Sequence, residues 1–98
     1  MKKLEPIHPG EILQEEFLSP LNISRTKLAE DTGISHAEVE KIVEGELAIS
    51  PNSALRLSLY FGLSERFWLN LQSRYDLEIE KDNLADRLRR EVRVLTTA

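Results

Sequence analysis

Residues 25–44, RTKLAEDTGISHAEVEKIVE, decide the fold of this chain. Two short helical segments are separated here by a glycine. Ser24 is a good N-cap for the first segment, and Gly33 stands where helices commonly end in a left-handed residue. Ser35 is a good N-cap for the second segment, and Glu38, three residues later, completes a capping box. The stretch therefore predicts two helices joined by a tight turn.

The spacing of four residues in this stretch resembles the helix-turn-helix of DNA-binding proteins. Ala29 is small where the two helices would cross, and Gly33 lies in the turn four residues later. Val39 and Ile42 are apolar where the second helix would pack on the first. They fall at the fifth, ninth, fifteenth and eighteenth positions of the twenty-residue pattern. A bulky side chain at position 29 would separate the helices, and a Cβ at position 33 would strain the turn.

Similar boundary signals lie on both sides of this stretch. Proline follows His8 and Ser50 at positions typical of a first helical residue, and glycine follows the apolar segment that ends at Phe61. No stretch alternates as a strand would. The signals predict further helices over residues 9–19, 51–61, 65–75 and 77–95. We therefore predict an all-α fold, with a five-helix phage-repressor-like helix-turn-helix domain over 1–76 and a C-terminal sixth helix and tail over 77–98.

Four motifs around the helix-turn-helix carry a more specific resemblance. HPGEIL begins at His8, ALRLSLYFG at Ala54, FWLNLQ at Phe67 and YDLE at Tyr75. In this order and spacing they are similar to the HigA (VapI-like) family of antitoxins, over about residues 7–80. The resemblance implies a small dimeric antitoxin with a phage-repressor-type (XRE) domain. Such a protein binds a ribonuclease toxin of the HigB type and represses the promoter of their shared operon.

Composition restricts the function further. The chain has 98 residues, 41% of them hydrophobic and 31% charged, and no cysteine. One small soluble domain is expected, with no thiolate metal site, no cysteine nucleophile and no membrane span, and its expected location is the cytoplasm. Neither a phosphate-binding loop nor a nucleophile elbow is present, so an enzyme is not expected. The two histidines, His8 and His36, lie too far apart in the sequence to suggest a metal site, and no cofactor is expected.

The resemblance also implies which residues contact DNA. In helix-turn-helix proteins the second helix enters the major groove, and the start of the preceding helix faces the phosphates. Carried onto this sequence, the DNA-binding residues are Arg25, Thr26 and Lys27 on the first helix and Ser35, His36, Ala37, Glu38, Glu40 and Lys41 on the second.

The charge of this surface is unusual for a DNA-binding protein. The net charge is −4, the isoelectric point is about 5.2, and glutamates accompany the predicted recognition helix. A carboxylate can accept a hydrogen bond from cytosine, but an unpaired one is repelled by phosphates. Glu38 could instead serve the helix cap, and Glu44 could be solvated. Two alternatives therefore stay open: a toxin-binding module with little DNA affinity, and a stand-alone repressor of the same fold.

Apolar residues after the helix-turn-helix predict partner surfaces. An antitoxin dimer would explain the reading of paired half-sites. A toxin that holds RNA would be basic, which an acidic partner complements. A narrow stripe of Leu84, Leu88, Val92 and Leu95 on the last helix is the candidate toxin anchor, and packing in a dimer or within the same chain is an equally open alternative. For the aromatic side chains of Phe67, Trp68 and Tyr75, packing in the core of one subunit is the alternative to a place in an interface. The dimer or partner interface is predicted at Phe67, Trp68, Leu71, Tyr75, Leu84 and Leu88.

Overall fold

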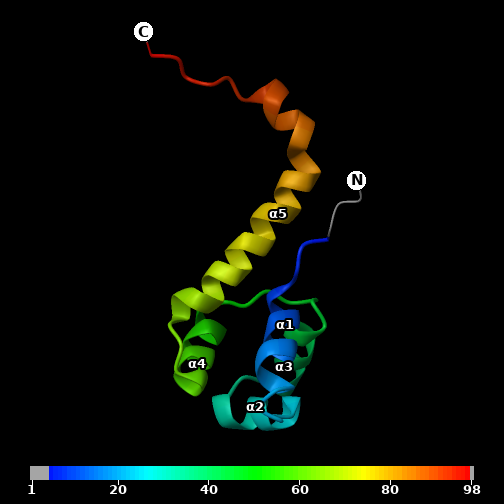
Figure 1. Cartoon of the computed structure of the whole chain (residues 1–98), viewed down its shortest axis with the longest axis vertical. Coiled ribbons are helices and arrows are strands. Elements are labelled where there is room, and N and C mark those ends of the chain that lie inside the picture. The colour runs from blue at the N-terminus through cyan, green and yellow to red at the C-terminus, as the bar shows by residue number, and fades with distance from the viewer. Residues whose placement is uncertain (1–4, 98) are drawn as a thin grey trace.

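The computed structural model describes residues 5–97, and within them every regular element is helical. Helices α1 to α4 form a compact body, and α5 leaves this body as a long rod (Figure 1). No helix in this part of the chain is both long and apolar enough to cross a membrane. The elements are α1 (Pro9–Ile12), η1 (Leu13–Leu18), α2 (Arg25–Thr32), α3 (His36–Val43), α4 (Pro51–Phe61) and α5 (Glu65–Glu91). The predicted all-α fold with a helix-turn-helix is confirmed.

Serine side chains cap four of the helices. Ser24 accepts a hydrogen bond from the backbone N–H of Lys27, and Ser35 accepts one from that of Glu38. The serines before α4 and α5 do the same for their first turns. Gly33 follows α2 with φ at 78°, a left-handed conformation that glycine adopts without steric cost. The sequence signals thus place the ends of α2, α3 and α4 correctly.

The first predicted helix divides into two kinds of helical turn. After the single turn of α1, η1 is a π-helix, and the Ser19 N–H bonds the carbonyl of Gln14, five residues back, at 2.9 Å. This wider pattern ends directly before Pro20, whose nitrogen carries no hydrogen to continue a helix.

The predicted break between the fifth and sixth helices was wrong. One continuous helix, α5, spans Glu65–Glu91, so the predicted domain boundary at residues 76 and 77 falls inside it. No glycine or proline lies in this region, and side-chain pairs one turn apart bridge it. Gln72 donates to Asp76 at 2.9 Å, and Arg74 pairs with Glu78 at 3.4 Å. Residues 92–95, the end of the predicted sixth helix, are not helical.

Trp68 lies in the centre of the core and is completely buried. Its ring contacts those of Phe17, Phe61 and Phe67, with centroids 5.0, 5.9 and 5.0 Å away. Trp68 therefore packs three elements, η1, α4 and α5, together within one subunit. Its predicted place in a dimer or partner interface was wrong, because no part of its side chain reaches the surface. The other buried apolar residues are Leu13, Leu18, Leu28, Ala29, Ile34, Val39, Ile42, Ile49, Ala54 and Leu57.

His8 joins the start of α1 to the middle of α5. Its Nδ1 accepts a hydrogen bond from the N–H of Gly10 at 2.9 Å, and its ring meets the edge of Tyr75 with centroids 4.9 Å apart. Burial lowers the pKa of His8, and the charge of Asp76 opposes this only in part. A protonated Nδ1 could no longer accept the hydrogen bond that caps α1.

We expect His8 to make the protein less stable in mild acid. Its pKa is lower in the folded than in the unfolded chain, so the unfolded chain binds the proton more readily. The stability due to neutral His8 is complete above the unfolded pKa of about 6.5 and is lost as the pH falls through the folded pKa. Asparagine caps helices and does not titrate, so His8→Asn is the matched variant. Urea unfolding from pH 8 to 5 should show wild type losing stability relative to this variant, and a constant difference would contradict the expectation.

Candidate nucleic-acid interface

The start of α2 lies alongside the exposed face of α3. The small Ala29 side chain is buried, as is Val39 on the inner face of α3. At the surface, Thr26 Oγ1 lies 3.1 Å from His36 Nε2, which joins the first turns of the two helices. In Figure 1, α2 lies at the end of the body that is opposite α5, and α3 lies beside α1. This arrangement defines a helix-turn-helix with its second helix accessible to a ligand.

The structure brings most of the predicted DNA-binding residues onto this one surface. Val39 and Ile42 face the core, which leaves the opposite side of α3 in solvent. Arg25 and Glu40 are half-buried at its edge. The exposed members are Thr26, Lys27, Ser35, His36, Ala37 and Lys41.

Arg25 is held by the recognition helix itself. Its Nη1 lies 2.7 Å from Oε2 of Glu40 and 2.8 Å from Oε1 of Glu44. Its Nε donates to Oε1 of Gln14 at 3.3 Å. The hydrogen bonds that Arg25 donates to Glu44 and, to a smaller extent, to Glu40 raise the pKa of Arg25 above its already high value. Sequence reasoning missed these partners because they are 15 and 19 residues away along the chain.

Lys27 and Lys41 differ in their surroundings. Lys27 forms an ion pair with Asp31 one turn later on α2, at 2.9 Å, and this contact raises its pKa. Asp31 also accepts a hydrogen bond from the Tyr60 hydroxyl at 2.7 Å, and that bond, followed by the one from Lys27, lowers the pKa of Asp31. Among residues 5–97, no acidic side chain pairs with Lys41. Lys41 is therefore the cation on α3 that is best placed to meet a phosphate.

The Glu38 side chain has a different contact from the helix cap that the sequence predicts. The Ser35 half of the predicted capping box is present, but the Glu38 carboxylate does not return to the cap. Its Oε2 instead accepts a 2.6 Å hydrogen bond from Ser53, which is fully buried at the start of α4. Glu38 therefore ties α3 to α4 through a serine side chain that is buried at the start of α4.

Arg56 is a structural residue that sequence reasoning did not place. It comes from an otherwise apolar segment of α4, which was its only signal. Its Nη1 donates to the carbonyl of Thr32 at 3.0 Å, and its Nε donates to Asn52 at 2.8 Å. The guanidinium thus satisfies a free carbonyl at the end of α2, beside the turn at Gly33.

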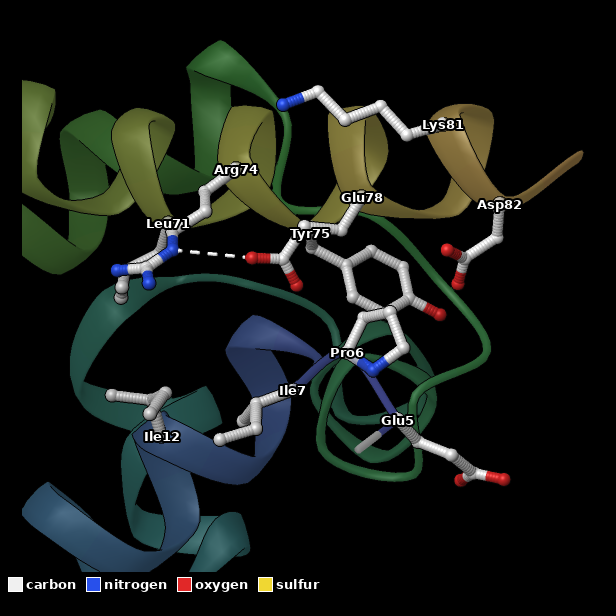
Figure 2. Close-up of a pocket in the computed structure, with 10 residues that line it drawn as sticks. All are labelled: Glu5, Pro6, Ile7, Ile12, Leu71, Arg74, Tyr75, Glu78, Lys81 and Asp82. Atoms are coloured by element: carbon white, nitrogen blue, oxygen red, sulfur yellow. Dashed lines mark hydrogen bonds and ion pairs between the residues drawn. The ribbon is translucent and has the colours of Figure 1, made fainter. Parts of the chain in front are cut away.

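A second surface feature lies between the N-terminal segment and α5. A groove of about 560 Å³ lies here. In Figure 2, Ile7 and Ile12 lie on one side of it and Leu71 and Tyr75 lie on the other. The Arg74–Glu78 ion pair lies at its rim (Figure 2). Of the predicted interface residues, Leu71 and Tyr75 line this groove, Phe67 is exposed at the start of α5, and Leu84 and Leu88 lie further along the rod.

Comparisons with known proteins agree with this geometry. A family model described as helix-turn-helix matches residues 13–68. Virulence-associated protein I of Dichelobacter nodosus is 40% identical over 81 residues, covering 83% of this chain and 75% of that protein. Antitoxin HigA-1 of Vibrio cholerae is 36% identical over 75 residues, covering 76% of this chain and 70% of that protein. The solved structure of Pseudomonas aeruginosa antitoxin HigA with the higBA promoter is 40% identical, with a TM-score of 0.90 over 94% of this chain and 100% of that one.

The extent of these matches identifies the family. The family model covers more than half of the chain, and the solved antitoxin superposes along almost its whole length, α5 included. The chain belongs to the HigA family of helix-turn-helix antitoxins.

Proposed function

We propose that the chain is the antitoxin of a toxin–antitoxin module and represses its own operon as a homodimer, through α3 in the major groove of the operator. The observation that carries this proposal is the accessible α2–α3 surface, on which Thr26 and His36 join the two helices and Lys41 is free to meet DNA. A homologous HigA with the same fold has been solved with its promoter, which supports this use of the surface. We propose the cytoplasm as its location, because a proposed operator and the RNA substrate of a proposed toxin would be found there.

Different residues of this surface have different proposed tasks. Lys27, Lys41 and the α2 N-terminus face phosphates, because cations and free N–H groups fix a protein on the duplex without reading its sequence. Ser35, His36 and Ala37 begin α3, the part of a recognition helix that contacts base edges. A second copy would double these contacts over half-sites about 34 Å apart.

We expect Lys41→Gln to weaken binding to operator and to random DNA by similar factors. Loss of one phosphate contact per subunit should reduce the slope of log affinity against log salt by about 1.8 for a dimer. Lys81→Gln on α5 is the matched control, because it changes the net charge equally away from this surface. The measurement is a titration of the chain's own upstream region and a scrambled duplex at several salt concentrations, with the dimer mass checked by light scattering.

Two outcomes would contradict this assignment. Equal slopes for Lys41→Gln and Lys81→Gln would remove Lys41 from the interface. Equally undetectable binding of wild type to both duplexes at low salt would favour a toxin-binding module with little DNA affinity. The acidic side chains of Glu44 and Glu46 beside α3 are the observation behind that alternative.

We further propose that the distal part of α5 and the segment after it bind a basic ribonuclease toxin. Leu88, Val92 and Leu95 are 41%, 60% and 85% exposed, so apolar surface is available there. The acidic N-terminal half of the chain would attract a partner that binds RNA phosphates.

Leu88→Asp combined with Val92→Asp should therefore weaken binding to the toxin encoded beside this gene by about tenfold or more. Leu59→Asp makes the same chemical change at an 86% exposed leucine of α4 and should have little effect. Titration calorimetry with the purified toxin measures both variants. Equal affinities for all three proteins would exclude the distal part of α5 as the anchor.

A further inference from the structure

The Arg25 guanidinium is fixed by side chains from two other elements. Glu40 of α3 and Glu44, the residue that caps the end of α3 one turn later, both accept from Nη1, at 2.7 and 2.8 Å. Gln14 of η1 accepts from Nε on the other side, and its own amide donates to Ser19 at 2.9 Å. The guanidinium therefore occupies one position between η1 and α3, although Arg25 itself begins α2.

The ion pairs matter more for charge at the surface than for the stability of the fold. The Arg25 side chain is 32% exposed, and exposed ion pairs contribute little to folding. Without Arg25, however, α3 would carry two unpaired carboxylates one turn apart, which repel each other and any phosphate nearby. With Arg25 in place, the three groups together carry one negative charge instead of two.

Nη1 and Nε of Arg25 are engaged in these contacts, and the two carboxylates outweigh its charge, so a phosphate that approached Nη2 would meet a group of net negative charge. To give its Nη1 to a phosphate, it would have to leave Glu40 and Glu44 and uncover two negative charges at the DNA surface. That exchange gains one phosphate contact and creates two repulsive ones, so the internal pairing is favoured.

We propose that Arg25 is a positioning residue of the recognition helix: it stays bound to Glu40 and Glu44 on the operator, holds α3 against the start of α2, and neutralises carboxylates that would otherwise repel DNA. The inference rests on the proposed DNA-binding surface. It changes the expected role of Arg25 from a phosphate contact to an internal counter-ion. It also assigns Glu40 to the same cluster, so that Glu40 is not a free reader of cytosine.

The test is a mutant cycle on operator affinity. Arg25→Gln is made in the wild-type chain and in the Glu40→Gln, Glu44→Gln background, and each protein is titrated with operator and scrambled duplex at several salt concentrations. In the wild-type chain, Arg25→Gln should reduce operator affinity about tenfold or more. A loss of this size is in the range that is found when two residues in direct contact depend on each other. In the double-glutamine background the same substitution should change affinity less than about threefold, because no carboxylate remains to be neutralised.

The salt dependence separates this role from a phosphate contact. A positioning residue releases no DNA counter-ion, so Arg25→Gln should leave the log–log slope unchanged. A phosphate ligand would reduce it by about 1.8 for a dimer. Arg87→Gln, which removes an exposed ion pair with Glu91 on α5, controls for the change in net charge.

The outcomes distinguish this inference from the proposed function. A reduced slope, or an equal loss of affinity in both backgrounds, would overturn the positioning role while DNA binding stands. Wild-type protein that does not prefer operator over scrambled duplex would overturn the proposed DNA-binding function and this inference with it. Circular dichroism and thermal unfolding of all four proteins check that loss of binding is not loss of fold.

Discussion

Replacing Gly10 with alanine is expected to abolish the packing of α1 on α3. A Cβ at this position would lie 1.7 Å from the carbonyl oxygen of Ile42, 2.7 Å from its carbonyl carbon and 3.0 Å from Cα of Val43. All three are backbone atoms of α3, so no side-chain rotation can relieve the clash. Either α1 separates from α3 or the recognition helix moves.

The expected loss is about 3–5 kcal/mol, above the usual range for an added methyl group in a core because the obstacle is backbone. Natural domains are stable by only about 5–15 kcal/mol, so the variant should be largely unfolded at moderate urea concentrations. Trp68 is the only tryptophan and is completely buried, so its fluorescence reports the unfolding directly.

Gly62→Ala is the matched control for this glycine. Gly62 has a φ of 76°, which strains an alanine, but a Cβ there meets no atom within 4 Å. Its expected loss is about 1–2 kcal/mol, from backbone strain alone. Equal urea midpoints for the two variants would show that the close approach at Gly10 is not what joins α1 to α3.

Replacing Trp68 with alanine is the second large effect that we expect. The indole is packed against aromatic side chains from η1, α4 and α5, and its removal leaves a cavity where these three elements meet. Large-to-small changes of this kind cost about 3–5 kcal/mol. Because α5 packs on α4 and α4 packs on α2 of the helix-turn-helix, operator binding should be lost along with stability.

Trp68→Phe separates ring packing from the polar atom. None of the described protein groups accepts a hydrogen bond from the indole Nε1, so phenylalanine loses some packing but no hydrogen bond within this part of the chain. We expect its loss to be less than half that of alanine, measured by circular dichroism in urea because the fluorescent probe is gone. Similar losses for both variants would contradict the ring-packing account.

The helix boundaries that local chemistry determines were predictable from the sequence. Ser24, Ser35 and Gly33 act on backbone groups within a few residues of themselves, so their pattern is visible in a short window. The break expected near Asp76 had no such signal, because neither glycine nor proline is present there. The apolar residues change their spacing along the chain near this point, and that change was mistaken for the start of a new helix. The stripe changes because α5 leaves the body of the protein, while its backbone continues.

The surface of the candidate site was predictable, but its internal contacts were not. Helical periodicity places His36 and Lys41 in solvent and Val39 in the core, as the structure shows. The partners of Arg25 and Glu38 lie on other helices, and only the packing of those helices brings them within hydrogen-bond distance. The apparent excess of negative charge on α3 is therefore reduced in the folded protein, since Glu40 and Glu44 are both paired with Arg25.

The continuity of α5 has a mechanical consequence. From Trp68 in the core to Leu88 on the rod the helix advances 1.5 Å per residue, a distance of about 30 Å. A flexible tether of the same residues would let its end sample many directions, whereas a helix fixes both reach and heading. The rod is thus a rigid spacer that is anchored in the core, and its far end has a defined distance and orientation relative to the recognition helix.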